Sequence, residues 1–77
     1  MEIGNIKLHV EEAWELLELE AKRSPPAPKG WELEYDEPKI KVILHHPRWV
    51  EIIGSKGRQW LPINKLQAIE KVIEKVI

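Results

Sequence analysis

Apolar residues recur along the chain with two different periods, one typical of helices and one typical of strands. Between residues 9 and 23, apolar side chains recur at steps of three and four, at Val10, Ala13, Trp14, Leu17 and Ala21. This spacing predicts a helix over about residues 9–23 with one apolar face. Residues 1–8 fit either a short strand or a lead into the helix.

The segment SPPAPKG, residues 24–30, ends this helix. Its three prolines cannot continue a helix and favour a stiff, extended chain. We therefore expect a connector between the helix and a sheet.

From residue 31 apolar and polar residues alternate with a period of two, which indicates strands. Four alternating runs, WELEYDE, KIKVILH, WVEII and RQWLPI, are separated by the turn sequences DEPK, HHPRW and GSKG. They predict a sheet over about residues 31–63. Because Pro62 cannot donate a ladder hydrogen bond, the last strand should lie at an edge or end there.

A second helical pattern occupies residues 64–77. Asn64 can cap it, and Gln67 three residues later completes a capping box. The apolar stripe consists of Leu66, Ile69, Ile73 and Val76. The whole chain, residues 1–77, is thus predicted to be a single α+β domain with an N-terminal helix, a four-stranded antiparallel meander and a C-terminal helix.

The turns predict the register of the sheet, which decides which side chains share a face. GSKG favours a tight hairpin that places Ile53 opposite Arg58. HHPRW admits two registers. A two-residue loop would set Leu44 beside Glu51, whereas a three-residue loop pairs His45 with Trp49. We prefer the second, because it gathers one apolar layer: Trp31, Leu33, Tyr35, Ile40, Val42, Leu44, Val50, Ile52, Leu61 and Ile63.

The opposite face then carries Trp49 and Trp60, pointing away from Leu44 and Leu61. Ile43 and Ile53 join the two indoles, and the cluster is edged by His45, Arg48, Lys56 and Arg58. A small soluble domain should not leave such a patch in water without a reason.

Length and composition limit how this fold can be stabilised. A chain of 77 residues buries only about 60% of its unfolded surface, and no cysteine is present to add a disulfide. Association with a second copy, a homodimer, is the expected supplement. No signal peptide and no apolar run of about 20 residues is found, so we expect a cytoplasmic protein without a membrane partner. The Glu, Lys and Ile content suits a thermophile.

Charge is distributed unevenly. Residues 1–37 contain four basic and ten acidic residues, and residues 38–77 contain eight basic and three acidic ones. Such asymmetry is typical of a nucleic-acid-binding half, or of two halves that attract each other.

Three arrangements could cover the patch. The acidic first helix could lie over it, bringing Trp14 and Leu17 onto Trp49 and Trp60 and giving a three-layer domain. Single-stranded DNA or RNA could stack on the indoles. The residues predicted to bind it are Lys41, His45, Arg48, Trp49, Lys56, Arg58, Trp60 and Lys65. Against this, the net charge is −1. Thirdly, a protein partner or second copy could dock, since Leu16, Leu19, Val72 and Ile77 look surplus to a core.

The run GSKGRQWLPINKLQAIEKVI, after three earlier strands, resembles the single-stranded-DNA-binding transcriptional coactivator fold, to which the Whirly proteins are similar. The resemblance covers residues 31–77 at the level of topology. It implies a curved sheet that binds single strands and a helix that helps form dimers. The acidic strand WELEYDE and the N-terminal helix depart from that family.

No catalytic motif is present. His45 and His46 are adjacent in a strand and should point to opposite faces, so they cannot readily share a metal. GSKG lacks the length of a phosphate-binding P-loop. We therefore predict no enzyme, no cofactor and no small-molecule substrate. The expected function is that of a small nucleic-acid-binding or regulatory accessory protein; the alternative is a protein-interaction module or homodimer without nucleic-acid contact.

Overall fold

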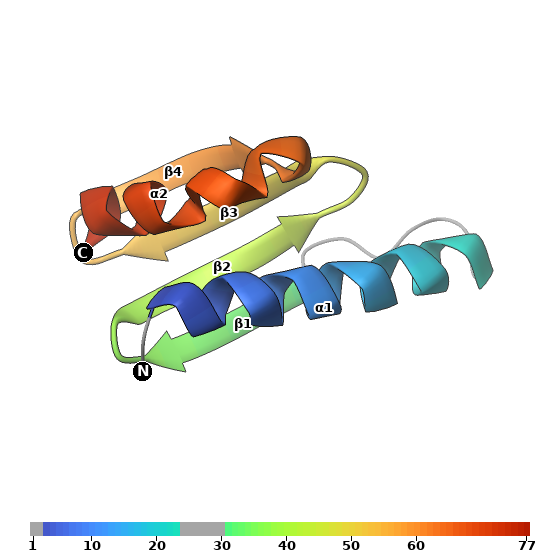
Figure 1. Cartoon of the computed structure of the whole chain (residues 1–77), viewed down its shortest axis with the longest axis horizontal. Coiled ribbons are helices and arrows are strands. Elements are labelled where there is room, and N and C mark those ends of the chain that lie inside the picture. The colour runs from blue at the N-terminus through green and yellow to red at the C-terminus, as the bar shows by residue number, and fades with distance from the viewer. Residues whose placement is uncertain (1–2, 24–30) are drawn as a thin grey trace.

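The helices and strands of the chain lie where the two hydrophobic periods predict them. The computed structural model describes residues 3–23 and 31–77. Their order is α1 (Ile3–Arg23), β1 (Trp31–Asp36), β2 (Lys39–His45), β3 (Trp49–Gly54), β4 (Gly57–Pro62), the 3-10 helix η1 (Ile63–Ala68) and α2 (Ile69–Val76) (Figure 1). The strands form one antiparallel meander, β1-β2-β3-β4, so the predicted α+β fold is confirmed. The predicted connector, residues 24–30, lies outside the described residues.

The register of all three strand pairs agrees with the one predicted from the turns. His45 lies opposite Trp49, so the three-residue loop is the correct reading of HHPRW. Ile53 lies opposite Arg58 across the GSKG hairpin. Because side chains alternate between the faces of a strand, these pairings fix the members of both faces.

Both helices lie on the same face of the sheet (Figure 1). The buried side chains of this layer are Ile6, Val10, Ala13, Trp14 and Leu17 from α1, Tyr35, Ile40, Val42, Leu44, Val50, Ile52 and Leu61 from the sheet, and Leu66, Ile69, Ile73 and Val76 from η1 and α2. The domain therefore has two layers. The three-layer arrangement is wrong: Trp14 is buried in the core, where its Nε1 donates a 2.8 Å hydrogen bond to Glu18.

α1 begins at Ile3, earlier than the predicted start at residue 9. Ile6 is fully buried and lies four residues before Val10, so it extends the same apolar stripe. The strand-like alternation of Ile6, Leu8 and Val10 is overridden by this packing, which leaves Leu8 on the outer side of the helix. At the other end of the chain, the predicted stripe on the second helix is buried as expected.

The second helix differs in how it begins. η1 starts directly after Pro62, and no side chain caps it, so the predicted Asn64–Gln67 capping box is wrong. The N–H of Ile63 instead donates to the carbonyl of Arg48 at 2.8 Å. This bond holds the end of β4 against the β2–β3 turn, and regular α-helix begins only at Ile69.

The β3–β4 hairpin turn closes the far end of α2. The N–H of Lys56 donates to the carbonyl of Val76 at 2.8 Å, and the Ser55 hydroxyl donates to the carbonyl of Ile77 at 3.4 Å. These bonds satisfy carbonyls that have no partner inside the helix. Gly54 allows the approach, because a Cβ there would overlap the Val76 carbonyl oxygen and lie 2.7 Å from its carbon.

A hydrogen bond of 2.8 Å between the Tyr35 hydroxyl and His9 Nδ1 ties α1 to β1. Burial raises the pKa of the Tyr35 phenol above its ordinary value of 10.0. Neither α-helix in the described parts of the chain is long and apolar enough to cross a membrane.

Candidate nucleic-acid interface

The face of the sheet opposite the helices is covered by neither of them. We call it the open face. Its side chains form cross-strand rows. The first row is Glu34, Lys41, Ile53 and Arg58, the second is Glu32, Ile43, Glu51 and Trp60, and the third is His45, Trp49 and Pro62. Neighbouring members of a row lie about 5 Å apart, and neighbouring rows about 7 Å apart.

An aromatic cluster occupies the second and third rows. Trp49 and Trp60 meet edge to face, with ring centroids 6.3 Å apart, and the His45 ring lies 4.8 Å from Trp60. Trp49 is 41% exposed and Trp60 50% exposed, although both are large apolar side chains. The prediction that the indoles point away from Leu44 and Leu61 is confirmed, since those leucines lie in the core on the other face.

Glu51 lies beneath this cluster and is only 4% exposed. One of its carboxylate oxygens lies 3.0 Å from His45 Nε2, and the other accepts a 3.0 Å hydrogen bond from Arg58 Nη1. An ionised carboxylate only accepts hydrogen bonds, so His45 Nε2 carries its proton. The sequence analysis did not single out Glu51, whereas in the structure it connects His45 of β2 with Arg58 of β4.

The position of Glu51 determines the charge that the β3–β4 half presents. It is the only acidic residue between Arg48 and Pro62, and it is buried against a cation. The side chains of Arg48, Lys56 and Arg58 are all exposed. This half of the open face therefore presents two indoles and three cations to solvent, and no exposed carboxylate.

The β1–β2 half has mixed charge. Lys41 Nζ lies 3.8 Å from Glu32 and 3.7 Å from Glu34, and Asp36 is paired in register with Lys39. Exposed pairs of this kind contribute about 0–1 kcal/mol each to stability. The acidic strand β1 thus lies at one edge of the open face, and β4, which carries Trp60, lies at the other.

The structure brings together five of the residues predicted to bind nucleic acid: Lys41, His45, Trp49, Arg58 and Trp60 share the open face. Arg48 lies in the β2–β3 turn and Lys56 at the tip of the β3–β4 hairpin, so they stand at opposite ends of the aromatic strands. Lys65 is not among them, because it lies in η1, outside the sheet.

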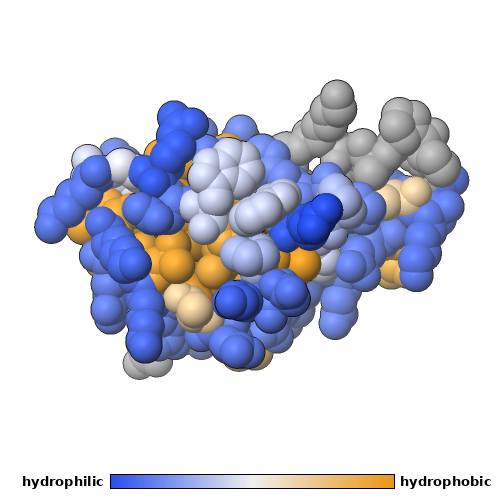
Figure 2. Space-filling view, turned by 90° about the horizontal axis from the view of Figure 1, so that it is seen from above, coloured by the Kyte–Doolittle hydropathy of each residue, from blue (hydrophilic) through white to orange (hydrophobic). Residues whose placement is uncertain are grey.

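Figure 2 shows one side of the domain, on which hydrophilic side chains surround an area where hydrophobic ones gather.

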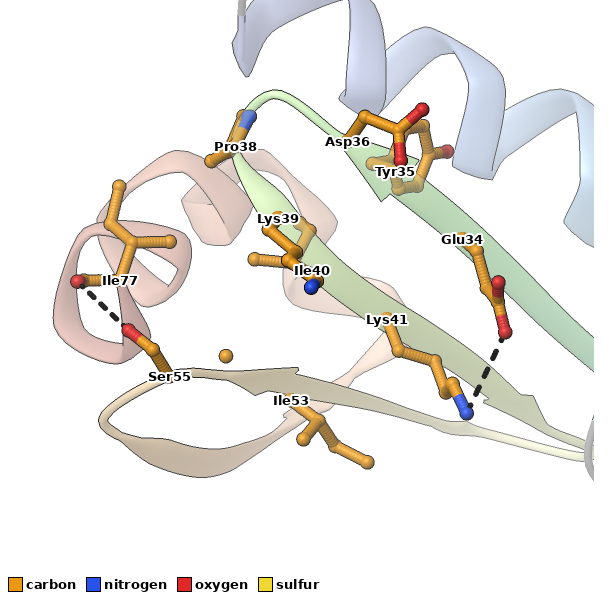
Figure 3. A pocket seen from close by; sticks show the side chains of 11 residues that line it. Glu34, Tyr35, Asp36, Pro38, Lys39, Ile40, Lys41, Ile53, Ser55 and Ile77 are labelled. Carbon is orange, nitrogen blue, oxygen red and sulfur yellow. Dashed lines mark hydrogen bonds and ion pairs between the residues drawn. The ribbon is translucent and has the colours of Figure 1, made fainter.

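A cavity that the sequence analysis missed opens at one end of the sheet. Pairing between β2 and β3 begins at Lys41, so Lys39 and Ile40 continue past the last paired residue of β3 (Figure 3). The resulting notch has a volume of about 660 Å³. Ile40, Ile53 and Ile77 are among its apolar residues, and Lys39, Lys41 and Glu34 are among its polar ones.

The two adjacent histidines separate as predicted. His45 joins Glu51 on the open face, while the His46 ring stacks on Trp14 of α1, with centroids 6.1 Å apart. In the part of the chain that the structure describes, no three His, Asp or Glu side chains gather so that they could hold a metal ion.

Comparison of the chain with family models, with curated proteins and with solved structures finds no match. Any function must therefore be argued from the residues themselves.

Proposed function

We propose that this protein binds single-stranded nucleic acid on the β3–β4 half of its open face, as a small accessory or regulatory protein of the cytoplasm. The indoles of Trp49 and Trp60 would stack on bases. The cations of Arg48, Lys56 and Arg58 would meet phosphates at either end of the strands. The resemblance of residues 31–77 to the single-stranded-DNA-binding coactivator fold also predicts binding of single strands.

One observation carries the proposal. Two indoles are about half exposed between three exposed cations, and the one carboxylate among them is buried and paired with Arg58, which leaves two net positive charges on this half. Base stacking on an aromatic side chain contributes about 1–3 kcal/mol per base, and it tolerates any sequence because every base has a flat face. The overall charge of −1 does not oppose binding, because the acidic residues are concentrated in the first half of the chain.

A titration followed by tryptophan fluorescence tests the proposal. A single-stranded oligonucleotide is expected to quench the emission of Trp49 and Trp60 and to do so more weakly at higher salt, because phosphate contacts release counterions. Duplex DNA of the same sequence should quench less, since its bases are already stacked. Absence of quenching at low salt would refute a nucleic-acid role.

Charge reversal separates a specific surface from general attraction. The double variant Arg48→Glu and Lys56→Glu is expected to lose binding, because both side chains are exposed and neither forms a salt bridge among the described residues. The matched control is Lys71→Glu with Lys75→Glu, two exposed positions on α2 that change the net charge equally. If the two pairs weaken binding alike, the proposed surface is wrong.

A second copy of the chain is the partner we propose for α1. Its outer side leaves Leu8, Leu16 and Leu19 more than half exposed, and the core of so short a chain is small. Sedimentation is expected to show a mass that rises with concentration. Leu16→Lys together with Leu19→Lys should leave a folded monomer. A native chain that is monomeric at every concentration would contradict the dimer. Concentration-dependent association without any response to oligonucleotides would instead favour a protein-interaction module.

A further inference from the structure

The notch at the end of the sheet is continuous with the proposed nucleic-acid path. Lys41 and Ile53 line it (Figure 3). Both also belong to the first row of the open face, which ends at Arg58. In the next row, Trp60 is the diagonal neighbour of Ile53, about 7–8 Å away, and Lys41 lies one strand beyond Ile53. A strand that stacks one base on Trp60 therefore brings a neighbouring base to the notch. Its volume of about 660 Å³ lies within the range of small-ligand sites, about 300–1,000 Å³.

The lining of the notch offers a flat ring both apolar contact and hydrogen bonds. Ile53 supplies aliphatic surface on the open-face side of the notch. Glu34 lies beside Lys41, with its oxygen 3.7 Å from the ammonium nitrogen. This distance exceeds that of a hydrogen bond, about 2.7–3.2 Å. The Glu34 side chain is also 73% exposed. Its carboxylate thus lies beside the ammonium group and is still able to accept hydrogen bonds from a ligand.

A carboxylate next to an ammonium group is a selective arrangement for a base. Two carboxylate oxygens accept best from two adjacent N–H donors, and the ammonium group donates to a neighbouring oxygen. Guanine carries this pattern on its Watson–Crick edge, where the N1–H and the N2 amino group adjoin the O6 acceptor. Thymine and uracil have one N–H between two oxygens, and adenine has no oxygen at all.

We propose that the notch is a guanine-binding subsite, which rests on the proposed function above. Glu34 accepts from N1–H and N2–H of the base, Lys41 donates to O6, and the ring lies against Ile53. Arg58, in the same row, meets the phosphate that leads to the base stacked on Trp60.

Oligonucleotides that differ in one base test this subsite. The probes are an oligothymidine of about eight nucleotides, the same strand with one central guanine, and the same strand with inosine at that place. Inosine keeps N1–H and O6 and lacks the N2 amino group. Guanine is expected to tighten binding about tenfold over thymine, and inosine should lose most of that gain. The Glu34→Gln variant should bind all three probes alike, whereas Glu74→Gln on α2 should retain the preference.

The outcomes distinguish the subsite from the wider function. If all three probes bind the native chain equally, the guanine subsite is refuted and binding of single strands stands. If a preference exists but survives in Glu34→Gln, the assignment to the notch is refuted. If no probe binds at all, the proposed function and the subsite fail together.

Discussion

Replacing Gly54 with alanine is expected to destabilise the domain by about 1–3 kcal/mol, which would lower its melting temperature by several degrees or more. The added methyl group would overlap the carbonyl oxygen of Val76, which is backbone and cannot rotate away. Relief requires the hairpin to move off α2, which would break the 2.8 Å bond from Lys56 N–H to Val76. Because a chain of this size is stable by only about 4–12 kcal/mol, the loss should be large in a thermal or urea melt.

The matched control is the same substitution at Gly4. There a Cβ would lie 3.6 Å from a Glu70 carboxylate oxygen, which is ordinary contact, and the backbone is helical. Alanine is a better helix former than glycine by about 0.8–1 kcal/mol, so Gly4→Ala should leave the stability unchanged or raise it. A Gly54→Ala protein as stable as the native one would show that the hairpin does not depend on close contact with α2.

The sheet was predictable because its turns and its alternation constrain each other. GSKG fixes Ile53 opposite Arg58, and the requirement for one apolar layer then decides between the two readings of HHPRW. A one-residue slip would have placed Leu44 beside Glu51, on the wrong face. The outward position of Trp49 and Trp60 follows from that choice alone.

The face covered by α1 was not predictable by the same reasoning. Alternation states which residues share a face, but it does not state where a helix packs. α1 is apolar on more than one side, since Leu8, Leu16 and Leu19 are exposed while Ile6 and Leu17 are fully buried. Its acidic residues suggested attraction to the basic strands. The larger area of aliphatic surface on the other face decides the packing instead.

Two features of the site were missed for different reasons. The burial of Glu51 could have been found from the register, which places His45 and Arg58 on the rows either side of it. The notch could not have been found in this way. It forms because the β3–β4 hairpin is held against the end of α2 and does not pair with Lys39 and Ile40. That contact joins Lys56 to Val76, at opposite ends of a strand-and-helix segment, and no local pattern indicates it.

Replacing Trp60 with alanine should weaken binding of a labelled single-stranded oligonucleotide by about tenfold to a hundredfold, as measured by fluorescence anisotropy. The range corresponds to the loss of one stacked base, about 1–3 kcal/mol. Trp60 is the central side chain of the aromatic cluster, in contact with both His45 and Trp49.

Two further substitutions separate stacking from simple apolar contact. Trp60→Phe keeps a flat ring and should retain most of the affinity, whereas Trp60→Leu keeps apolar bulk and should lose nearly as much as alanine. Trp49 remains as a fluorescent reporter in all three, and circular dichroism verifies the fold. Equal affinity for the leucine and phenylalanine variants would mean that the patch recognises apolar surface rather than bases. The open face would then be a docking surface for protein, since only a ligand with flat rings distinguishes the two side chains.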